Sequence, residues 1–308
     1  MKTSLKTLKP SHLALAAALA FGGASAYAAE AAPAATKPVP GANANVQAQA
    51  RKQADTLIQE AITALRETEL ALQLLEQGKK KEALEAMARA TGKLEIIIAR
   101  DPKLALAPVD VVVRAQEFLG TVEDIERVVK KARSALGDQR VQDARRLLEP
   151  LASEFTIEVV NLPMATYPAA IKEAARLTEK DQIAEAKKLL ATTLNTLVVQ
   201  QTAIPIPLLH VEEALKQAEQ LAKKANRTAD EEKKLADLLR FASEEVALAA
   251  ALGYGSKEEH KTFQKEIKEL SKKTEGGKSG SGLFEGVKAS LAKLFKSSEN
   301  GQTNATQP

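Results

Sequence analysis

Histidine and cysteine, the ligands of most structural and catalytic zinc sites, are scarce in this sequence. After residue 28 the chain contains two histidines, His210 and His260, and the whole chain contains no cysteine. Neither histidine has a glutamate three positions before it, and no His-Glu-x-x-His stretch occurs, so the ligand patterns of di-iron bundles and zinc proteases are missing. We therefore expect no metal and no cofactor. We expect His210 to cap a helix or face solvent, and His260 to lie at the surface.

The residue patterns of nucleophilic and acid–base catalysis are also missing. Residues 277–279 (Gly-Lys-Ser) resemble the end of a phosphate-binding loop, but position 272 is lysine where such a loop needs glycine. Residues 280–282 (Gly-Ser-Gly) do not form the Gly-x-Ser-x-Gly motif of hydrolases. Adjacent carboxylates such as Glu244 and Glu245 point in different directions on a helix, so we expect them to be solvated. The sequence predicts no catalytic residue and a protein that is not an enzyme.

The first 28 residues indicate export. Lys2, Lys6 and Lys9 form a positive segment, residues 13–21 form a short apolar run, and residues 26–28 (Ala-Tyr-Ala) are a small-residue cleavage site. This pattern is typical of a secretory signal peptide over residues 1–28 that is cleaved after its last alanine. The apolar run is too short to span a bilayer of about 30 Å, and an uncleaved anchor is the alternative. We expect the mature protein in the periplasm.

Charge and composition limit the partners and the fold. The formal net charge of +4 falls to +1 once the three lysines of the signal peptide are removed, so we expect no nucleic-acid partner. No later window reaches the ~18 consecutive apolar residues of a transmembrane helix. Aromatic residues make up 3% of the chain and tryptophan is absent, so alanine and aliphatic side chains must form the core, as in helical bundles.

The chain divides into four segments by composition. After the signal peptide, residues 29–45 are rich in alanine and proline and predict a disordered linker. Residues 46–273 carry helical periodicity and predict one helical domain, which begins with a helix over 46–77. Residues 274–308 predict a flexible tail that contains an amphipathic helix at 283–296.

Three stretches of the helical domain resemble one another. Ala83, Ala144 and Ala186 follow polar turns at 78–81, 137–140 and 179–182, and each is followed by apolar residues three, four and eleven positions later. A helix places these positions on one face, so we expect three related helical hairpins. We expect Pro150 to kink or break the second of these helices. The unequal spacings favour a compact bundle over a regular solenoid.

Short extended segments are expected where these helices end. Apolar and β-branched residues precede a proline at 96–98, 156–160 and 197–199, and residues before proline avoid helical geometry. We expect strands there and at 109–113, with frayed helix ends as the alternative. Further helices are expected at 168–177, 208–225, 228–251 and 256–273, the last two opened by capping boxes at Thr228 and Ser256. The predicted fold class is mainly α: a compact multi-helix bundle of related hairpins with a few short extended segments.

Two apolar features could bind a partner. The first is a pair of proline-containing loops, which are either buried or exposed as a binding surface. Their candidate binding residues are Leu162, Pro163, Met164, Tyr167, Pro205 and Pro207. The second is the amphipathic helix at 283–296, which could dock in a groove, lie on anionic lipid or pack on its own bundle. Its apolar face consists of Leu283, Phe284, Val287, Leu291, Leu294 and Phe295.

Several short motifs together resemble the YfdX protein family over roughly residues 50–260. They are Leu-Ala-Pro-Val-Asp at 106–110, Ala-Arg-Arg-Leu-Leu-Glu-Pro-Leu-Ala at 144–152, Asn-Leu-Pro at 161–163, Thr-Tyr-Pro-Ala-Ala-Ile at 166–171, Leu-Asn-Thr-Leu-Val-Val at 194–199, Ile-Pro-Ile-Pro-Leu at 204–208 and Ala-Leu-Gly-Tyr-Gly at 251–255. The resemblance implies a bacterial, exported, mainly helical protein associated with stress responses such as acid exposure. It implies no catalytic residue.

These features lead to two hypotheses for the function. The first is an exported, non-enzymatic binding protein of the bacterial envelope that holds apolar segments of client proteins or a small apolar ligand. The alternative is a structural or interaction protein that forms homo-oligomers or rests on the membrane surface through residues 283–296. An enzyme would require Asp110, Tyr167, Tyr254 or His210 to converge in one pocket.

Overall fold

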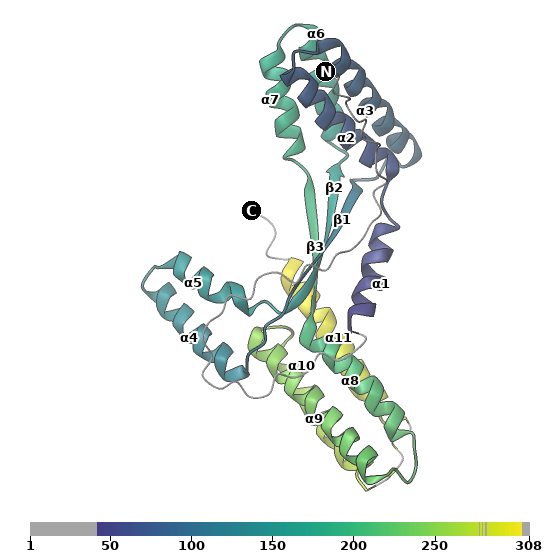
Figure 1. Ribbon diagram of the computed structural model, residues 1–308, viewed down its shortest axis with the longest axis vertical. Helices are drawn as coiled ribbons and strands as arrows, with labels where there is room; N and C mark the ends of the chain where they lie inside the picture. The colour runs from purple at the N-terminus through teal and green to yellow at the C-terminus, as the bar shows by residue number, and fades with distance from the viewer. Residues whose placement is uncertain (1–41, 277, 279, 281, 304–308) are drawn as a thin grey trace, which may run out of the picture. The chain divides into compact units, whose positions relative to one another are not determined.

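A computed structural model describes residues 42–276, 278, 280 and 282–303. The expected signal peptide, most of the expected linker at 29–45 and the last residues of the tail lie outside these residues. The described chain is mainly helical with one small sheet, which confirms the predicted fold class (Figure 1). Its elements are α1 (Ala42–Ala54), α2 (Gln59–Glu76), α3 (Lys80–Arg100), β1 (Leu106–Gln116), α4 (Val122–Gly137), α5 (Val141–Leu148), a 3-10 turn (Glu149–Leu151), β2 (Glu154–Pro163), α6 (Tyr167–Glu179), α7 (Ile183–Leu194), β3 (Val198–Pro205), α8 (Ile206–Ala222), α9 (Ala229–Leu252), α10 (Lys257–Thr274) and α11 (Glu285–Thr303).

A unit of two helices and one strand occurs three times. The units are α2–α3–β1, α4–α5–β2 and α6–α7–β3. Ala83, Ala144 and Ala186 occupy equivalent positions in the three units. The residue five positions before each of them has a positive φ: 74° at Gly78, 60° at Gln139 and 60° at Asp181. The following N–H donates to the carbonyl five positions before it, from Lys79 to Leu74, from Arg140 to Ala135 and from Gln182 to Leu177, at 2.8–2.9 Å. This is the Schellman motif that ends many helices, and it confirms three related hairpins.

The three strands form one antiparallel sheet in the order β1-β2-β3 (Figure 1). Residues 109–113 and 156–160 lie in β1 and β2, and β3 begins at Val198, so extended structure is confirmed in these segments. The prediction for Ile96, Ile97 and Ile98 is wrong, because these residues belong to α3. The nearest proline is Pro102, and a proline restricts only the residue directly before it, so the helix continues to Arg100.

Other helix boundaries differ from the sequence prediction for local reasons. The helix expected over 46–77 is divided into α1 and α2, and the N–H of Ile58 between them donates to the Pro108 carbonyl of β1 at 3.0 Å. The helix that carries Ala144, α5, ends at Leu148. Pro150 lies in the following 3-10 turn, because a proline has no N–H to continue the hydrogen bonds of an α-helix. Phe155 therefore lies on β2 and not on the helical stripe. The capping boxes at Thr228 and Ser256 are both formed.

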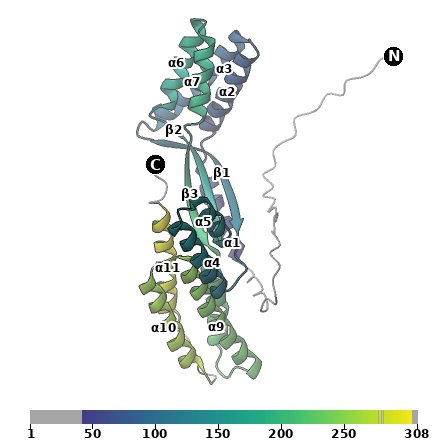
Figure 2. The same cartoon turned by 90° about the vertical axis from the view of Figure 1, so that its left-hand side faces the viewer.

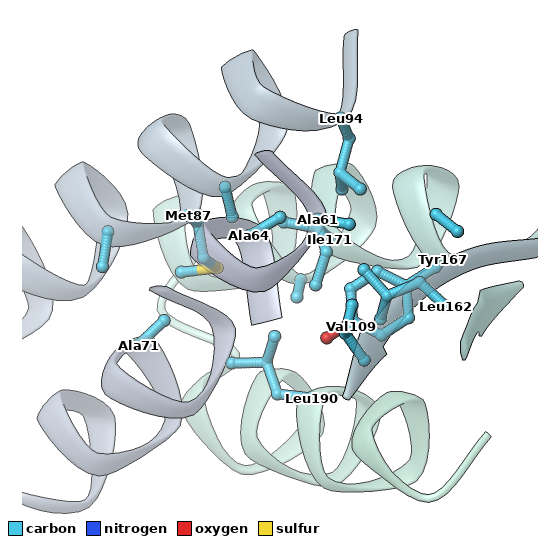
Figure 3. Packing of buried hydrophobic residues seen from close by; sticks show 14 of the residues in the cluster. Ala61, Ala64, Ala71, Met87, Leu94, Val109, Leu162, Tyr167, Ile171 and Leu190 are labelled. Carbon is cyan, nitrogen blue, oxygen red and sulfur yellow. The ribbon is translucent and has the colours of Figure 1, made fainter. Parts of the chain in front are cut away.

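The first and third hairpins share one hydrophobic core. It is lined by small side chains of α2 and α3 together with larger ones from α6 and α7, and the ends of β1 and β2 enter it (Figure 3). Its fully buried members include Ala61, Ala64, Ala71, Ala83, Ala86, Met87, Ala90, Leu94, Leu162, Tyr167, Ile171 and Leu190. Alanine at the helix contacts lets the backbones approach closely, and the aliphatic side chains fill the space between the pairs.

A second core joins α8, α9, α10 and α11 (Figure 2). Phe284 and Leu294 are fully buried, Val287 and Leu291 are nearly so, and Leu283 and Phe295 are partly buried against this core. The amphipathic helix therefore packs on its own bundle. The tail expected at 274–308 is not separate from the helical domain, because its residues 284–298 complete the core that α8–α10 begin.

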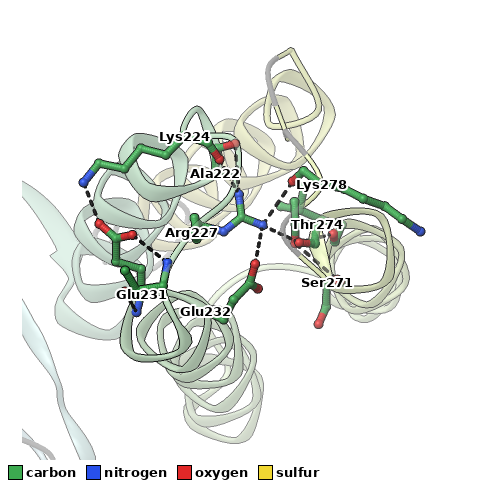
Figure 4. A network of polar contacts seen from close by, with 10 residues as sticks. Ala222, Lys224, Arg227, Glu231, Glu232, Ser271, Thr274 and Lys278 are labelled. Carbon is green, nitrogen blue, oxygen red and sulfur yellow. Dashed lines mark hydrogen bonds and ion pairs between the residues drawn. The ribbon is translucent and has the colours of Figure 1, made fainter.

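A buried arginine joins the segments that follow α8 and α10 at one end of this second core (Figure 4). The Arg227 guanidinium donates to the carbonyls of Lys224 at 2.9 Å, Thr274 at 2.5 Å and Lys278 at 3.0 Å, and it pairs with Glu232 at 3.1 Å. Carbonyls at helix C-termini lack partners within the helix and carry partial negative charge. Arg227 satisfies such carbonyls after α8 and at the end of α10, and so fixes the connection to α11.

The hairpin of α4 and α5 has the smallest core. Its buried cluster consists of Ala132, Ala135 and Ala144, with Leu147 partly buried. The sequence analysis did not specify α4, although Thr121 and Asp124 form a capping box at its start. Apolar side chains of this hairpin, those of Leu136, Val141 and Leu148, remain exposed.

The left-handed conformation at Gly78 predicts that replacing glycine by alanine changes the free energy of unfolding in opposite directions at Gly78 and at Gly92. Gly78→Ala should lower the free energy of unfolding by about 1 kcal/mol, because an L-residue is strained at a φ of 74° although an added Cβ meets no atom within 4 Å. Gly92→Ala, inside α3 and equally free of contacts, should raise it by about 0.5–1 kcal/mol. Thermal unfolding measures both changes, and equal signs would contradict the role of the turn.

The docking of α11 predicts a large cost for truncating its buried face. Leu294→Ala should lower the free energy of unfolding by about 2–5 kcal/mol, because it leaves a cavity in the second core. Lys296→Ala on the exposed side of the same helix should change it by less than about 0.5 kcal/mol. Urea denaturation compares the two variants. A Leu294→Ala protein as stable as the wild type would mean that α11 is not part of the core.

Candidate functional site

The proline-containing loops are parts of the interior. Leu162, Met164 and Tyr167 are 0%, 7% and 1% exposed, and the Met164 N–H donates to the Ala105 carbonyl at 2.9 Å. Pro163 is partly buried, and Pro205 and Pro207 are buried where β3 enters α8. Of the two interpretations that the sequence leaves open, the structure shows burial. These six residues present no apolar binding surface.

The residues that an enzyme would need to bring together lie apart. Asp110 is exposed on β1, Tyr167 lies in the first core, and His210 lies on α8. Tyr254 follows α9, and of these four residues it alone lines the cleft that is described below. Among the described residues no group of three or more His, Cys, Asp or Glu side chains is placed to hold a metal ion.

Both histidines are more buried than the sequence predicts. The Nδ1 atom of His210 lies 3.1 Å from Oε2 of Glu245, and the two side chains are 11% and 7% exposed. The prediction of a solvated Glu245 is therefore wrong, because α8 and α9 pack with these residues between them. His260 is 8% exposed, since the end of α9 and α11 cover it.

A cleft of about 430 Å³ lies between the second hairpin and the end of α9. Its apolar lining comes from three places that are distant in the sequence: α4, the α5 end with the following 3-10 turn, and the last turn of α9. The apolar side chains are Val129, Leu148, Leu151, Ala152, Ala251 and Leu252, and Gly253, Tyr254, Gly255, Ser297 and Ser298 complete the wall. A volume of this size is typical of sites that bind small molecules or single side chains.

Tyr254 fixes one wall of the cleft. Its hydroxyl donates to Oε2 of Glu154 at 2.9 Å and accepts from the N–H of Ser153 at 3.0 Å, so it ties the end of α9 to the start of β2. Burial raises the pKa of the Tyr254 hydroxyl well above its usual value, and the neighbouring Glu154 carboxylate raises it further. The phenol therefore stays protonated and serves as a structural hydrogen-bond donor.

Two glycines shape the turn that holds Tyr254. Gly253 and Gly255 have φ angles of 90° and 82°, and α9 ends at Leu252, one residue after the predicted end at 251. A Cβ at Gly255 would lie 2.8 Å from Cδ2 of Leu294 and 3.3 Å from Nε2 of His260. Only glycine allows this approach, which brings α11 against the turn.

The polar side chains of the cleft are already engaged. The Ser297 hydroxyl donates to Oε2 of Glu259 at 2.5 Å, and the Ser298 hydroxyl donates to the Leu294 carbonyl at 2.7 Å. Burial raises the pKa of Glu259, but hydrogen bonds from Ser297 and Ser256 outweigh it, so the pKa is lowered and the carboxylate stays ionised. Two hydroxyls of this wall, those of Tyr254 and Ser297, thus donate to carboxylates, and that of Ser298 donates to a backbone carbonyl.

Apolar side chains continue outside the cleft. Leu148 lines the cleft and is 41% exposed, while Leu136 and Val141 on the same hairpin are 49% and 57% exposed. Leu119, just before α4, is 83% exposed. Single exposed apolar residues are ordinary, but here four of them occur on one hairpin and the residues just before it.

His260 makes the wall of the cleft sensitive to acid. Its Nε2–H donates to the Tyr254 carbonyl at 2.6 Å, while its buried Nδ1 has no partner among the described residues. Burial lowers the pKa of His260, and this effect outweighs the Tyr254 carbonyl and Glu259, which raise it.

The unfolded chain therefore binds a proton at His260 at a higher pH than the folded chain does, so the free energy of unfolding should fall as pH decreases below about 6.5, the ordinary pKa of histidine. His260→Gln keeps an N–H donor and removes the proton-binding site, so its stability should change less between pH 7 and pH 5. Chemical denaturation at each pH tests this, and identical pH profiles would contradict it.

Comparisons with known proteins find a family model that matches part of this chain. The model, described as YfdX protein, matches residues 64–203, which begin within α2 and end within β3 and so cover most of the three hairpin–strand units. A solved structure of Salmonella Typhi YfdX aligns with this chain at 14% identity and a TM-score of 0.34. The alignment covers 49% of this chain and 93% of the Salmonella Typhi chain. No curated protein matches the chain. No described helix is both long and apolar enough to cross a membrane. The family match over residues 64–203 confirms the resemblance that the sequence motifs indicate, over a shorter stretch than the expected 50–260.

Proposed function

We propose that this chain is an exported, non-enzymatic binding protein of the bacterial envelope that holds apolar segments of client proteins at the cleft beside α4 and α5. The observation that carries the proposal is that Leu148, which lines the cleft, and Leu136 and Val141 on the same hairpin are all exposed apolar side chains. Exposing these side chains to water is unfavourable, at about 25 cal/mol per Å² of apolar area, and a client segment would relieve it.

The chemistry of the cleft favours binding over catalysis. Its hydroxyl groups on Tyr254, Ser297 and Ser298 all donate to acceptors within the protein. The remaining lining is aliphatic. Such a surface recognises a partner by apolar area and shape, which suits partners of varied sequence.

A client segment fits this surface better than a small ligand alone. The cleft could hold one or two side chains, and the exposed residues beyond it offer further contact that a small molecule would not reach. The signal-peptide pattern of residues 1–28 supports a location in the envelope, and the family resemblance supports a role under stress.

The membrane-surface alternative has less support. The side chains that would enter the lipid are those of Phe284, Val287, Leu291 and Leu294, and all four face the second core. Lipid binding through this face would require α11 to leave that core.

A charge in the cleft should abolish client binding. Leu148→Glu should reduce the protein's ability to slow the aggregation of reduced insulin by about tenfold or more, because a carboxylate opposes burial against an apolar client. Light scattering at several protein concentrations measures the effect.

The matched control is Ile96→Glu, because Ile96 on α3 is 45% exposed, close to the 41% of Leu148. This variant should keep wild-type activity. Wild-type protein that does not slow aggregation, or variants that lose activity equally, would refute the proposed site. Circular dichroism confirms that both variants are folded.

A further inference from the structure

The two helices of the α4–α5 hairpin carry the same short pattern of side chains. The residues are, on α4, Val129, Arg133 and Leu136, and, on α5, Val141, Arg145 and Leu148. In each triplet the arginine stands four positions after one apolar residue and three positions before the other. A helix places residues with these spacings on one face, so each helix presents a stripe with an arginine between two apolar side chains.

The two stripes lie on the same side of the hairpin. Val129 from the first stripe and Leu148 from the second both line the cleft of about 430 Å³. The other apolar members, Leu136 and Val141, are exposed, and so are both arginines of the stripes. A partner that covers this apolar surface therefore also meets two cationic groups.

The arginines of the stripes differ from the other arginines of the hairpin, which are all paired with carboxylates. The paired arginines and their partners are Arg127 with Asp124, Arg140 with Asp138 and Asp143, and Arg146 with Asp143. Within the part of the chain that the structure describes, Arg133 and Arg145 form an ion pair with no Asp or Glu side chain. Both guanidinium groups are thus available to a carboxylate from another molecule.

The charge around the stripes favours an acidic partner. Between residues 127 and 146 the chain has seven basic side chains and two acidic ones. A planar guanidinium can donate two parallel hydrogen bonds to one carboxylate, which makes arginine well suited to binding this group. The attraction strengthens when apolar groups exclude water from the pair. The hairpin is therefore complementary to a segment that carries carboxylates among apolar side chains.

We propose that the client segments held at this cleft combine apolar side chains with aspartate or glutamate, and that Arg133 and Arg145 bind their carboxylates. This inference rests on the proposed function, because it names the class of segment that the same site accepts. An apolar side chain of the segment enters the cleft beside Val129 and Leu148, and carboxylates near it pair with the two arginines. The concave cleft fits a projecting side chain better than it fits the flat surface of an anionic membrane.

Three synthetic peptides of one design test the charge preference. They share their phenylalanine and leucine residues and differ only in the residues between these, which are glutamate, glutamine or lysine. Fluorescence anisotropy with the whole purified protein should show that the glutamate peptide binds about three- to tenfold more tightly than the glutamine peptide, because two partly exposed ion pairs form. The lysine peptide should bind more weakly than the glutamine peptide, because its charges are repelled.

Matched pairs of arginine variants locate this preference. Arg133→Gln combined with Arg145→Gln should remove the advantage of the glutamate peptide and leave the affinity for the glutamine peptide unchanged. Arg133→Glu combined with Arg145→Glu should reverse the order, so that the lysine peptide binds best. The control combines Arg127→Gln with Arg146→Gln, which changes the net charge equally on the same two helices but outside the stripes. It should keep the wild-type order, and circular dichroism confirms that each variant is folded.

A further variant separates this inference from the function on which it rests. Leu148→Ser removes apolar area without adding charge, so it should weaken the binding of all three peptides by a similar factor. Equal affinities for the three peptides, each reduced by Leu148→Ser, would overturn the charge preference and leave the cleft as the client site. Absence of binding by every peptide would overturn both proposals.

Two other results would also overturn the inference. One is an order of affinities that the paired substitutions at Arg133 and Arg145 leave unchanged. The other is the absence of any preference among the peptides together with binding to phosphatidylglycerol vesicles that these substitutions abolish. That result would assign the two arginines to lipid headgroups in place of acidic client segments.

Discussion

Close packing of alanine-lined helices is the interaction on which the rest of this structure depends. Ala64 on α2 and Ala86 and Ala90 on α3 are fully inaccessible to water, and the same is true of Ala214 and Ala218 on α8. Small side chains allow close approach, but each buries little apolar area, so a pair of helices gains little stability alone. Each hairpin therefore needs a second pair of helices to complete a core.

Two of the helix groups meet this requirement, and one does not. The α2–α3 and α6–α7 hairpins share the first core, and α8–α11 share the second. The α4–α5 hairpin buries Ile125 and three alanines and leaves Leu136, Val141 and Leu148 exposed. The incomplete burial of this hairpin and the cleft beside it thus have one cause. A segment from another protein would supply the apolar area that a second helix pair would otherwise provide to this hairpin.

Local signals in the sequence predicted much of the fold. The repeat that aligns Ala83, Ala144 and Ala186 marks real hairpins, because helix periodicity and the turn before it are properties of adjacent residues. The site could not be found in this way, since Val129, Leu148 and Leu252 meet only through packing between distant elements. The burial of the proline-containing loops and of Glu245 also depends on tertiary contacts, and the hydropathy pattern of a sequence contains no information about such contacts.

Hydrogen–deuterium exchange, with and without a reduced client protein, tests most directly whether the α4–α5 hairpin is the incompletely covered, client-binding part of the chain. The account predicts that amides of α4 and α5 exchange faster than those of α2 and α3, because local stability follows buried apolar contact, and that the client slows them selectively. Equal protection of both hairpins in the free protein, or client-induced protection confined to other elements, would contradict it.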